Sequence, residues 1–182
     1  MKGLTTRLEG LVLLEPEVHA DARGFFLETY RADLHAAAGV DAEFVQDNHS
    51  RSGRGTLRGL HLQLGAGQAK LVRVARGKVL DVAVDLRGSS PTFGHYGAVE
   101  LDDLRHRQLY VPVGFAHGFL VLSETADVAY KVSSYYDPQL ERGVAWNDAD
   151  IGIQWGVEAP ILSDRDARNP RLAELRQELP DW

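Results

Sequence analysis

Short runs that alternate apolar and polar residues recur along this chain of 182 residues. In the clearest run, residues 80–86, Leu or Val occupies every second position and Asp or Ala fills the positions between. Successive side chains of a β-strand point to opposite faces, so this pattern predicts a strand with one apolar and one polar face. Turn-forming sequences recur at residues 87–91, 137–138 and 146–148. Several short strands separated by turns favour an all-β sandwich or barrel.

Helical patterns are few and short. Residues 31–38 are rich in Ala and are followed by Gly39, a residue typical of the C-terminal end of a helix. Leucines at helical spacing predict a second helix over residues 170–179. The chain has no internal repeat, low-complexity tract or Pro-rich linker. We therefore expect one domain over residues 1–182, with a few short peripheral helices.

The composition excludes several classes of protein. The chain has no cysteine, which excludes disulfides, thiolate zinc sites and cysteine nucleophiles. Its net charge of -6 argues against nucleic-acid binding, which needs a broad basic surface. No apolar run approaches the roughly 18 residues of a membrane helix, and the N-terminus lacks the basic-then-apolar pattern of a signal peptide. We therefore expect a cytoplasmic protein with no nucleic-acid or membrane partner.

Positive charge is concentrated in one window of the sequence. Residues 48–80 contain seven of the 20 Lys and Arg residues and neither Asp nor Glu. A basic patch on an otherwise acidic protein suits a small anionic ligand better than a polymer. The window therefore predicts a patch that binds a small anion.

Two strings of residues resemble the signature motifs of the cupin superfamily, whose fold is a double-stranded β-helix or jelly roll. The motif positions are Gly55, His61, Gln63, Lys70 and Gly77 in the first string, and Pro112, Gly114 and His117 in the second. Metal-binding cupins hold their ion with two His, a Glu and a final His, and here Gln63 and Lys70 stand at two of those positions. An ammonium has no lone pair and cannot coordinate a cation. The resemblance therefore implies a site without a metal, in which Lys70 supplies the positive charge.

The spacing of Arg58 and His61 predicts an irregular strand. Three positions separate them, which would put their side chains on opposite faces of a regular strand. Glycine permits a bulge that redirects a neighbouring side chain, and Gly59 lies between the two. We therefore expect an irregularity near Gly59 that turns both side chains to one site.

A longer ordered set of strings narrows the resemblance to one family. The strings are 21–28, 46–50, 57–63, 68–70, 85–87, 90–94, 114–119, 130–131, 135–138, 146–148 and 162–166. In this order they resemble the dTDP-4-dehydrorhamnose 3,5-epimerase family, and the resemblance runs from about residue 10 to residue 166. Each string is weak alone, but the ordered set is highly specific. The resemblance implies an enzyme that needs no cofactor and makes dTDP-4-dehydrorhamnose from the 4-keto-6-deoxyglucose nucleotide.

Such a reaction has definite chemical needs. Inverting a sugar carbon beside a ketone requires a base for the α-proton, a group that holds the enolate oxygen, and an acid on the opposite face. The resemblance assigns these roles to His61, Lys70 and Tyr130. It also places Asp166 where the carboxylate orients the imidazole and stabilises the imidazolium, as in a hydrolase triad. Unperturbed pKa values of about 6.5 for His and about 10 for Tyr suit a base and an acid at neutral pH.

The resemblance implies a second set of residues that contact the nucleotide sugar. Guanidinium groups pair with phosphate oxygens, and the family's diphosphate positions fall on Arg23 and Arg58. Tyr136 stands where the family stacks an aromatic ring on thymine. The implied substrate-binding set is Arg23, Phe26, Glu28, Gln46, Asn48, Arg58, Lys70, His117, Tyr136, Glu141 and Arg165. The resemblance also implies a homodimer, in which the N-terminal segment with Arg23 and Glu28 reaches the neighbour's site.

Three alternatives stay open from the sequence. An epimerase that inverts only C3, or only C5, would share nearly every residue named above. A metal-dependent cupin isomerase or dioxygenase would use His61 and His117 as ligands, although Gln63 and Lys70 make a poor ligand set. A sugar-binding cupin without catalysis would have no need of a base, an ammonium and an acid. We therefore expect an epimerase that acts on C3 and C5 of dTDP-4-dehydro-6-deoxy-D-glucose.

Overall fold

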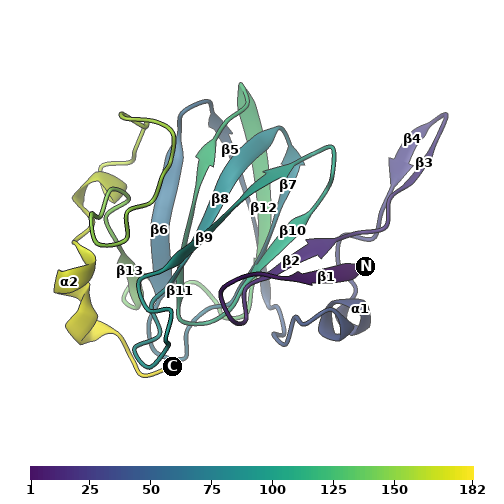
Figure 1. Cartoon of the computed structure of the whole chain (residues 1–182). Helices are drawn as coiled ribbons and strands as arrows, with labels where there is room; N and C mark the ends of the chain where they lie inside the picture. Colours follow the sequence, from purple (N-terminus) through teal and green to yellow (C-terminus); the bar gives the residue numbers. More distant parts are fainter.

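Two antiparallel β-sheets face each other in the computed structural model, which describes residues 1–182 except the side chain of Thr5 (Figure 1). The six-stranded sheet has the order β1 (Lys2–Thr5), β2 (Val12–Glu15), β10 (Gln108–Val111), β7 (Lys70–Arg76), β12 (Thr125–Val132) and β5 (Gln46–Gly53). The five-stranded sheet has the order β13 (Glu141–Gly143), β6 (Leu57–Gln63), β11 (Phe115–Val121), β8 (Lys78–Asp85) and β9 (Tyr96–Asp102). This arrangement is the cupin-type jelly roll, so the all-β prediction is confirmed.

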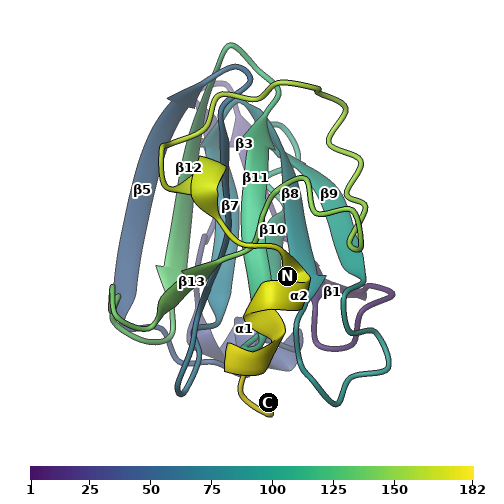
Figure 2. The same cartoon turned by 90° about the vertical axis from the view of Figure 1, so that its left-hand side faces the viewer.

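The main core lies between the two sheets. It contains side chains from both, among them Val72, Val74, Val79, Ala83, Phe115, Phe119 and Val128. A second apolar cluster covers the other face of the five-stranded sheet, where the C-terminal segment with α2 (Leu172–Leu175) crosses it (Figure 2). Strand β8 is therefore covered on both faces. Its polar face, with Asp81 and Asp85, points into the barrel instead of into solvent, and both carboxylates are fully buried.

Both predicted helices are present in shorter form. Helix α1 (Ala32–Ala37) is followed by Gly39, whose φ of +98° fits the residue that ends a helix. The second helix begins at Leu172 and changes type, because the four residues of α2 continue as the 3₁₀ helix η2 (Arg176–Glu178). The buried side chains Leu172 and Leu175 complete their contact with the sheet in a single turn. None of the described helices is both long and apolar enough to cross a bilayer.

A small hairpin stands away from the barrel (Figure 1). It consists of β3 (His19–Asp21) and β4 (Gly24–Phe26), which pair only with each other. The side chains of Phe25 and Phe26 are exposed, at 59% and 67% of their full area. The ring of Phe25 lies 4.5 Å from the ring of His106, but most of the surface of both phenylalanines is left uncovered by this chain.

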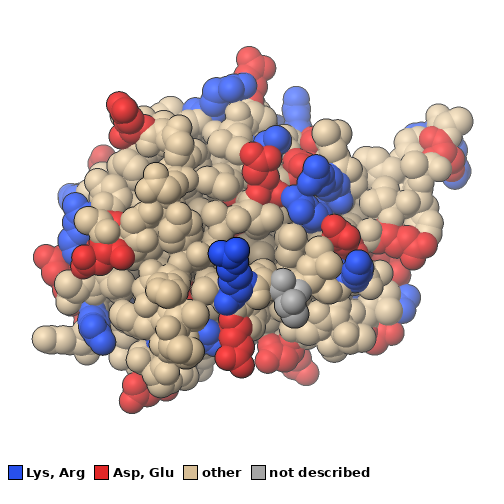
Figure 3. Space-filling view, in the orientation of Figure 1, with Lys and Arg blue, Asp and Glu red and all other residues tan. Residues whose placement is uncertain are grey.

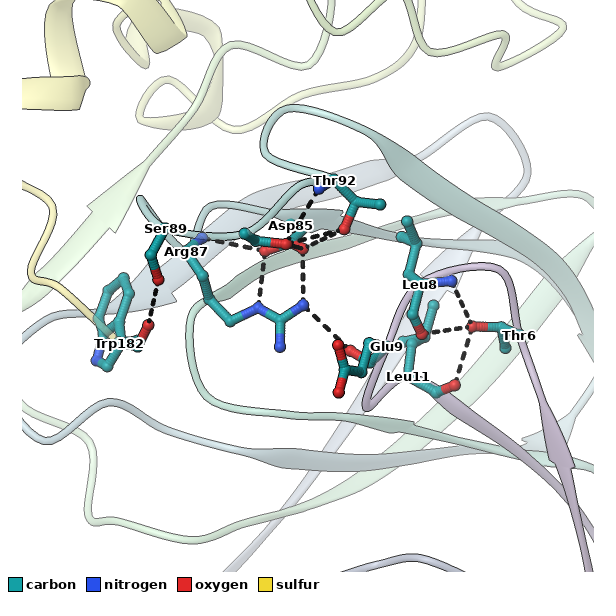
Figure 4. Close-up of polar contacts among 10 residues, drawn as sticks. Thr6, Leu8, Glu9, Leu11, Asp85, Arg87, Ser89, Thr92 and Trp182 are labelled. Carbon is teal, nitrogen blue, oxygen red and sulfur yellow. Dashed lines mark hydrogen bonds and ion pairs between the residues drawn. The ribbon is translucent and has the colours of Figure 1, made fainter.

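A buried carboxylate anchors the N-terminal segment to the end of β8 (Figure 4). Asp85 accepts hydrogen bonds from Arg87 Nε at 2.9 Å, from Ser90 Oγ at 2.6 Å and from Thr92 Oγ1 at 2.6 Å. Burial alone would raise the pKa of Asp85, but these hydrogen bonds outweigh it and lower the pKa to about 2. The Arg87 guanidinium also donates to the backbone oxygen of Glu9. One ionised cluster therefore holds two segments that are far apart in the sequence.

Candidate active site

A cavity of about 580 Å³ opens between the two sheets. Strands of both sheets contribute to its wall, together with the loops after β12 and after β13. Of the residues proposed from the sequence, those that line the cavity are Gln46, Asn48, Arg58, His61, Lys70, His117, Tyr130, Tyr136, Glu141, Arg165 and Asp166. Positions spread over most of the chain are thus brought to one site.

The irregularity predicted near Gly59 is confirmed. Opposite β11, His61 pairs with His117 and Arg58 pairs with Phe119, so the register shifts by one residue between them. Gly59 has a φ of +117°, and a Cβ at this position would lie 2.6 Å from Gly118 Cα. Only glycine fits such a close approach with this backbone conformation. The shift places both Arg58 and His61 on the wall of the cavity.

His61 is held by a buried carboxylate. Its Nε2 lies 2.6 Å from Oδ1 of Asp166, which is only 4% exposed. The other carboxylate oxygen accepts the backbone N–H of Gly59 at 3.4 Å. Burial opposes ionisation of Asp166, but the hydrogen bond from His61 and the charge of His61 lower its pKa overall. An ionised Asp166 fixes the ring orientation and stabilises a protonated His61, while Nδ1 has no hydrogen-bond partner among the described residues.

Lys70 is a buried cation next to this histidine. Its side chain is 7% exposed, and Nζ donates to the backbone oxygen of His61 at 3.1 Å. Burial lowers the pKa of Lys70 to about 8, against the opposing effect of the negative charges of Glu141 and Asp81. No carboxylate of the described residues forms an ion pair with Nζ. The ammonium is therefore free to stabilise negative charge that develops on a ligand.

Tyr130 contributes a phenol from the six-stranded sheet. It lies on β12, between Val72 of β7 and Asn48 of β5. Burial first, and then the negative charge of Glu141, raises the pKa of Tyr130. The phenol therefore stays protonated at neutral pH and can act only as a proton donor until a stronger base forms.

Three polar side chains meet at the rim of the cavity. Glu141 Oε2 accepts a hydrogen bond from the hydroxyl of Tyr136 at 2.8 Å and an ion-paired hydrogen bond from Arg165 Nη1. The hydrogen bond and charge of Glu141 raise the pKa of Arg165, which remains a cation. The ring of Tyr136 is half exposed. An aromatic face and a guanidinium thus lie together at the entrance, as a nucleotide diphosphate would need.

The chain as a whole matches one known family. The model of that family, described as dTDP-4-dehydrorhamnose 3,5-epimerase, matches residues 5–174. The chain belongs to the dTDP-4-dehydrorhamnose 3,5-epimerase family. A curated dTDP-4-dehydrorhamnose 3,5-epimerase of Shigella flexneri is 47% identical over 176 residues, which cover 96% of this chain and 97% of the relative.

Solved structures agree with this membership. The dTDP-6-deoxy-D-glucose-3,5-epimerase of Legionella pneumophila, in complex with dTDP-4-keto-L-rhamnose, superposes with a TM-score of 0.95 at 43% identity and covers 100% of this chain and 98% of its own. ChmJ, a 3'-monoepimerase of Streptomyces bikiniensis in complex with dTDP-quinovose, gives a TM-score of 0.89 at 38% identity and covers 98% and 90%. The fold is therefore shared by epimerases that differ in the number of centres they invert.

Three residues that the family resemblance placed in the site lie outside this cavity. Arg23 and Phe26 belong to the projecting hairpin, and Arg23 forms a bidentate ion pair with Asp21. Glu28 follows the hairpin, and its Oε2 lies 3.5 Å from Nη1 of Arg31. In a single chain, therefore, none of these three residues lines the cavity that contains His61.

The basic residues of the window 48–80 do not form the single patch that the sequence predicts. Of the seven basic residues in 48–80, only Arg58 and Lys70 line the cavity. Arg51 instead pairs with Asp127 at 2.6 Å, and Lys78 pairs with Glu100 at 3.1 Å. On the face drawn in Figure 3, Lys and Arg side chains are dispersed among Asp and Glu. A window of like charges in the sequence is divided here because alternate strand residues point to opposite faces.

The structure adds one pair that the sequence did not suggest. His117 Nε2 lies 2.8 Å from Oδ1 of Asp81, and both side chains are buried. Oδ2 of Asp81 has no hydrogen-bond partner among the described residues. One signal in the sequence could have predicted this pair. Asp81 shares a strand face with Val79 and Ala83, and both of these residues belong to the core. A buried Asp in a strand needs a partner, and only the pairing of β8 with β11 supplies it.

Proposed function

We propose that residues 1–182 form a single epimerase domain that inverts C3 and C5 of dTDP-4-dehydro-6-deoxy-D-glucose to give dTDP-4-dehydro-L-rhamnose. One observation carries the proposal: the buried ammonium of Lys70 lies beside the His61–Asp166 pair in one cavity. A base next to a fixed cation is what proton abstraction beside a ketone requires. The 3,5-epimerase relatives support the choice of substrate.

In this proposal His61 removes the proton from the carbon beside the C4 ketone. Asp166 stabilises the imidazolium that forms. Electron density moves to the C4 oxygen, where the ammonium of Lys70 stabilises the enolate. Tyr130 then donates its phenolic proton from the opposite face, which inverts the centre. His61 then releases its proton to solvent and Tyr130 regains one from solvent, after which the same groups invert the second carbon, because C3 and C5 both flank the ketone.

The rim residues suit the nucleotide part of the substrate. Arg58 and Arg165 present guanidinium groups to the diphosphate, and the half-exposed ring of Tyr136 offers a face for thymine. Gln46, Asn48, His117 and Glu141 provide further polar contacts along the cavity. Two of the positions that bind the metal in other cupins have other roles here. Lys70 is a cation, and the side-chain amide of Gln63 is hydrogen-bonded to a loop. We assign no metal or other cofactor to the reaction.

Labelling from heavy water tests this function directly. With the parent protein in deuterium oxide, we expect deuterium at both C3 and C5 of the sugar, because each inversion exchanges one carbon-bound proton with solvent. NMR or mass spectrometry of the product measures the position of the label. Label at C3 alone would instead indicate a monoepimerase like ChmJ. Label at neither carbon would exclude both activities.

We also propose a homodimer, acting in the cytoplasm, in which the hairpin completes the partner's site. The supporting observation is that Arg23 and Phe26 lie on the hairpin that projects from the barrel (Figure 1), that Glu28 follows it, and that none of the three lines its own cavity. Exposed Phe25 and Phe26 would be buried in such a contact. A projecting hairpin exchanged between copies gives a closed twofold assembly.

Complementation tests the exchange. An Arg23→Ala/Glu28→Ala variant and a His61→Asn variant should each be poorly active below the KM of the substrate. When they are co-expressed, we expect about a quarter of the parent activity, because half of random dimers are mixed and each has one complete site. The control pair is His61→Asn with Lys70→Met, whose defects lie in the same cavity and should give no recovery. Absence of recovery in the first pair would mean that the hairpin does not serve the neighbour.

A further inference from the structure

The side-chain amide of Gln63 makes three hydrogen bonds to one loop. Gln63 is 7% exposed at the end of β6, and its Nε2 donates to Ser134 Oγ at 3.0 Å and to the backbone oxygen of Tyr135 at 3.1 Å. Its Oε1 accepts the backbone N–H of Asp137 at 3.0 Å. One amide therefore binds both sides of Tyr136, the residue between Tyr135 and Asp137.

Two further glutamines bind other backbone groups of the same segment. Nε2 of Gln68 donates to the backbone oxygen of Ser134 at 2.9 Å, and Oε1 of Gln46 accepts the backbone N–H of Tyr136 at 3.1 Å. We call Gln46, Gln63 and Gln68 the glutamine cradle. Four consecutive residues, 134–137, each have a backbone group bound by a cradle side chain.

This arrangement is unusual for a loop. Backbone groups of surface loops are commonly satisfied by water, and such loops are correspondingly mobile. Here the backbone is fixed by side chains, while the ring of Tyr136 stays half exposed at the cavity entrance. Only the Tyr136 hydroxyl, which donates to Glu141, adds a polar contact from the side chain itself. The orientation of the ring therefore depends on the backbone that the cradle holds.

We propose that Gln63 is a positioning residue that holds Tyr136 ready for the base of the bound nucleotide. The inference rests on the proposed function, since it takes a pyrimidine nucleotide as the ligand of Tyr136. Gln63 occupies a position where a metal-binding cupin keeps a ligand, and this protein uses that position to anchor the recognition loop. A preformed loop has little ordering entropy to lose on binding, which increases affinity without a new contact.

The substitution Gln63→Glu isolates this role. A carboxylate has nearly the same shape but cannot donate to Ser134 Oγ or to the oxygen of Tyr135. With the loop released, we expect the Kd for dTDP and the KM for the nucleotide sugar to rise about tenfold, as the loss of two hydrogen bonds implies. The value of kcat should stay within about threefold of the parent, because His61, Lys70 and Tyr130 are unchanged.

A matched control exists in the same loop. Gln139 is exposed and its side-chain amide has no hydrogen-bond partner among the described residues, so Gln139→Glu makes the same chemical change without breaking an anchor. We expect its Kd for dTDP to remain that of the parent. Gln68→Glu, at a half-buried position, provides a second cradle variant and should weaken dTDP binding in the same direction as Gln63→Glu. Thermal unfolding of each variant establishes that it is folded.

A double-mutant cycle decides whether Gln63 acts through Tyr136. Calorimetry should give a tenfold loss of dTDP affinity for Gln63→Glu in the parent, and almost no further loss in a Tyr136→Ala background. Equal losses in the two backgrounds, or parent-like dTDP binding by both folded cradle variants, would overturn the inference. If the parent binds dTDP and exchanges deuterium while these cradle results fail, only the positioning role is wrong. A parent protein that does neither contradicts the proposed function as well.

Discussion

Replacement of His61 by Asn is expected to abolish proton exchange at both sugar carbons, with a loss of at least about 10³-fold in kcat. Asparagine keeps a polar group of similar size but has no basic nitrogen at neutral pH. Asp166 holds the His61 imidazole at 2.6 Å, and the other histidine of the cavity, His117, is more deeply buried, with 8% of its side chain exposed against 27% for His61. Deuterium uptake from heavy water measures the effect without depending on the later fate of the product.

Binding separates a chemical role of His61 from a structural one. We expect the His61→Asn variant to bind dTDP within about threefold of the parent, because the nucleotide contacts proposed for Tyr136 and Arg165 are untouched. The matched control is His95→Asn, an exposed histidine that does not line the cavity. His95→Asn should have parent-like exchange. Exchange at the parent rate in His61→Asn would remove His61 from the mechanism.

Replacement of Lys70 by Met is expected to change activity and stability in opposite directions. Methionine matches the length of the buried stem but carries no charge, so kcat should fall by about 10²–10³-fold as the enolate loses its cation. Burial lowers the pKa of Lys70 from 10.5 to about 8, which means that the charged form of Lys70 destabilises the folded state. This destabilisation is on the order of 3 kcal/mol, and removing it should raise the free energy of unfolding.

The lowered pKa of Lys70 also predicts how activity and stability change with pH. The Lys70 cation is present below pH 8 and is lost as pH rises through about 8, so kcat/KM of the parent should decline above that value. The sign for stability is opposite. The folded pKa lies below the unfolded one, so the cost of the charge is complete below about pH 8 and fades toward pH 10.5. In Lys70→Met both dependences on this group should vanish.

Lys78→Met is the control for the effects at Lys70. Lys78 lies on the surface and pairs with Glu100 at 3.1 Å, an interaction of a kind that contributes little to stability. We expect parent-like values for kcat and nearly unchanged denaturant midpoints. Should Lys70→Met retain parent activity, or lose stability while folded, the idea of a costly but useful buried cation would be contradicted.

Local sequence rules were enough to predict several features of the site. The three-residue spacing between Arg58 and His61, with Gly59 between them, required an irregular strand, and the register shift of β6 against β11 supplies it. Along β7, Lys70 and Val72 are two positions apart and therefore share a face, and both are buried inside the barrel. These features depend on strand geometry over a few residues, which the sequence displays directly.

Features that depend on pairing between distant strands were missed or misjudged. The partner of His117 is Asp81, and only the alignment of β8 with β11 brings them together. The basic window of 48–80 was expected to act as one patch, but Arg51 faces Asp127 of β12. Spacing along a chain does not reveal which strands become neighbours, so contacts across a barrel need the structure.

The position of Asp166 in the chain makes the site depend on the C-terminal segment. Every strand from β1 to β13 precedes it, whereas its partner His61 lies in β6. The same segment covers the outer face of the five-stranded sheet with Leu172 and Leu175. Truncation before residue 166 would therefore remove the carboxylate beside the histidine and expose an apolar sheet face at once.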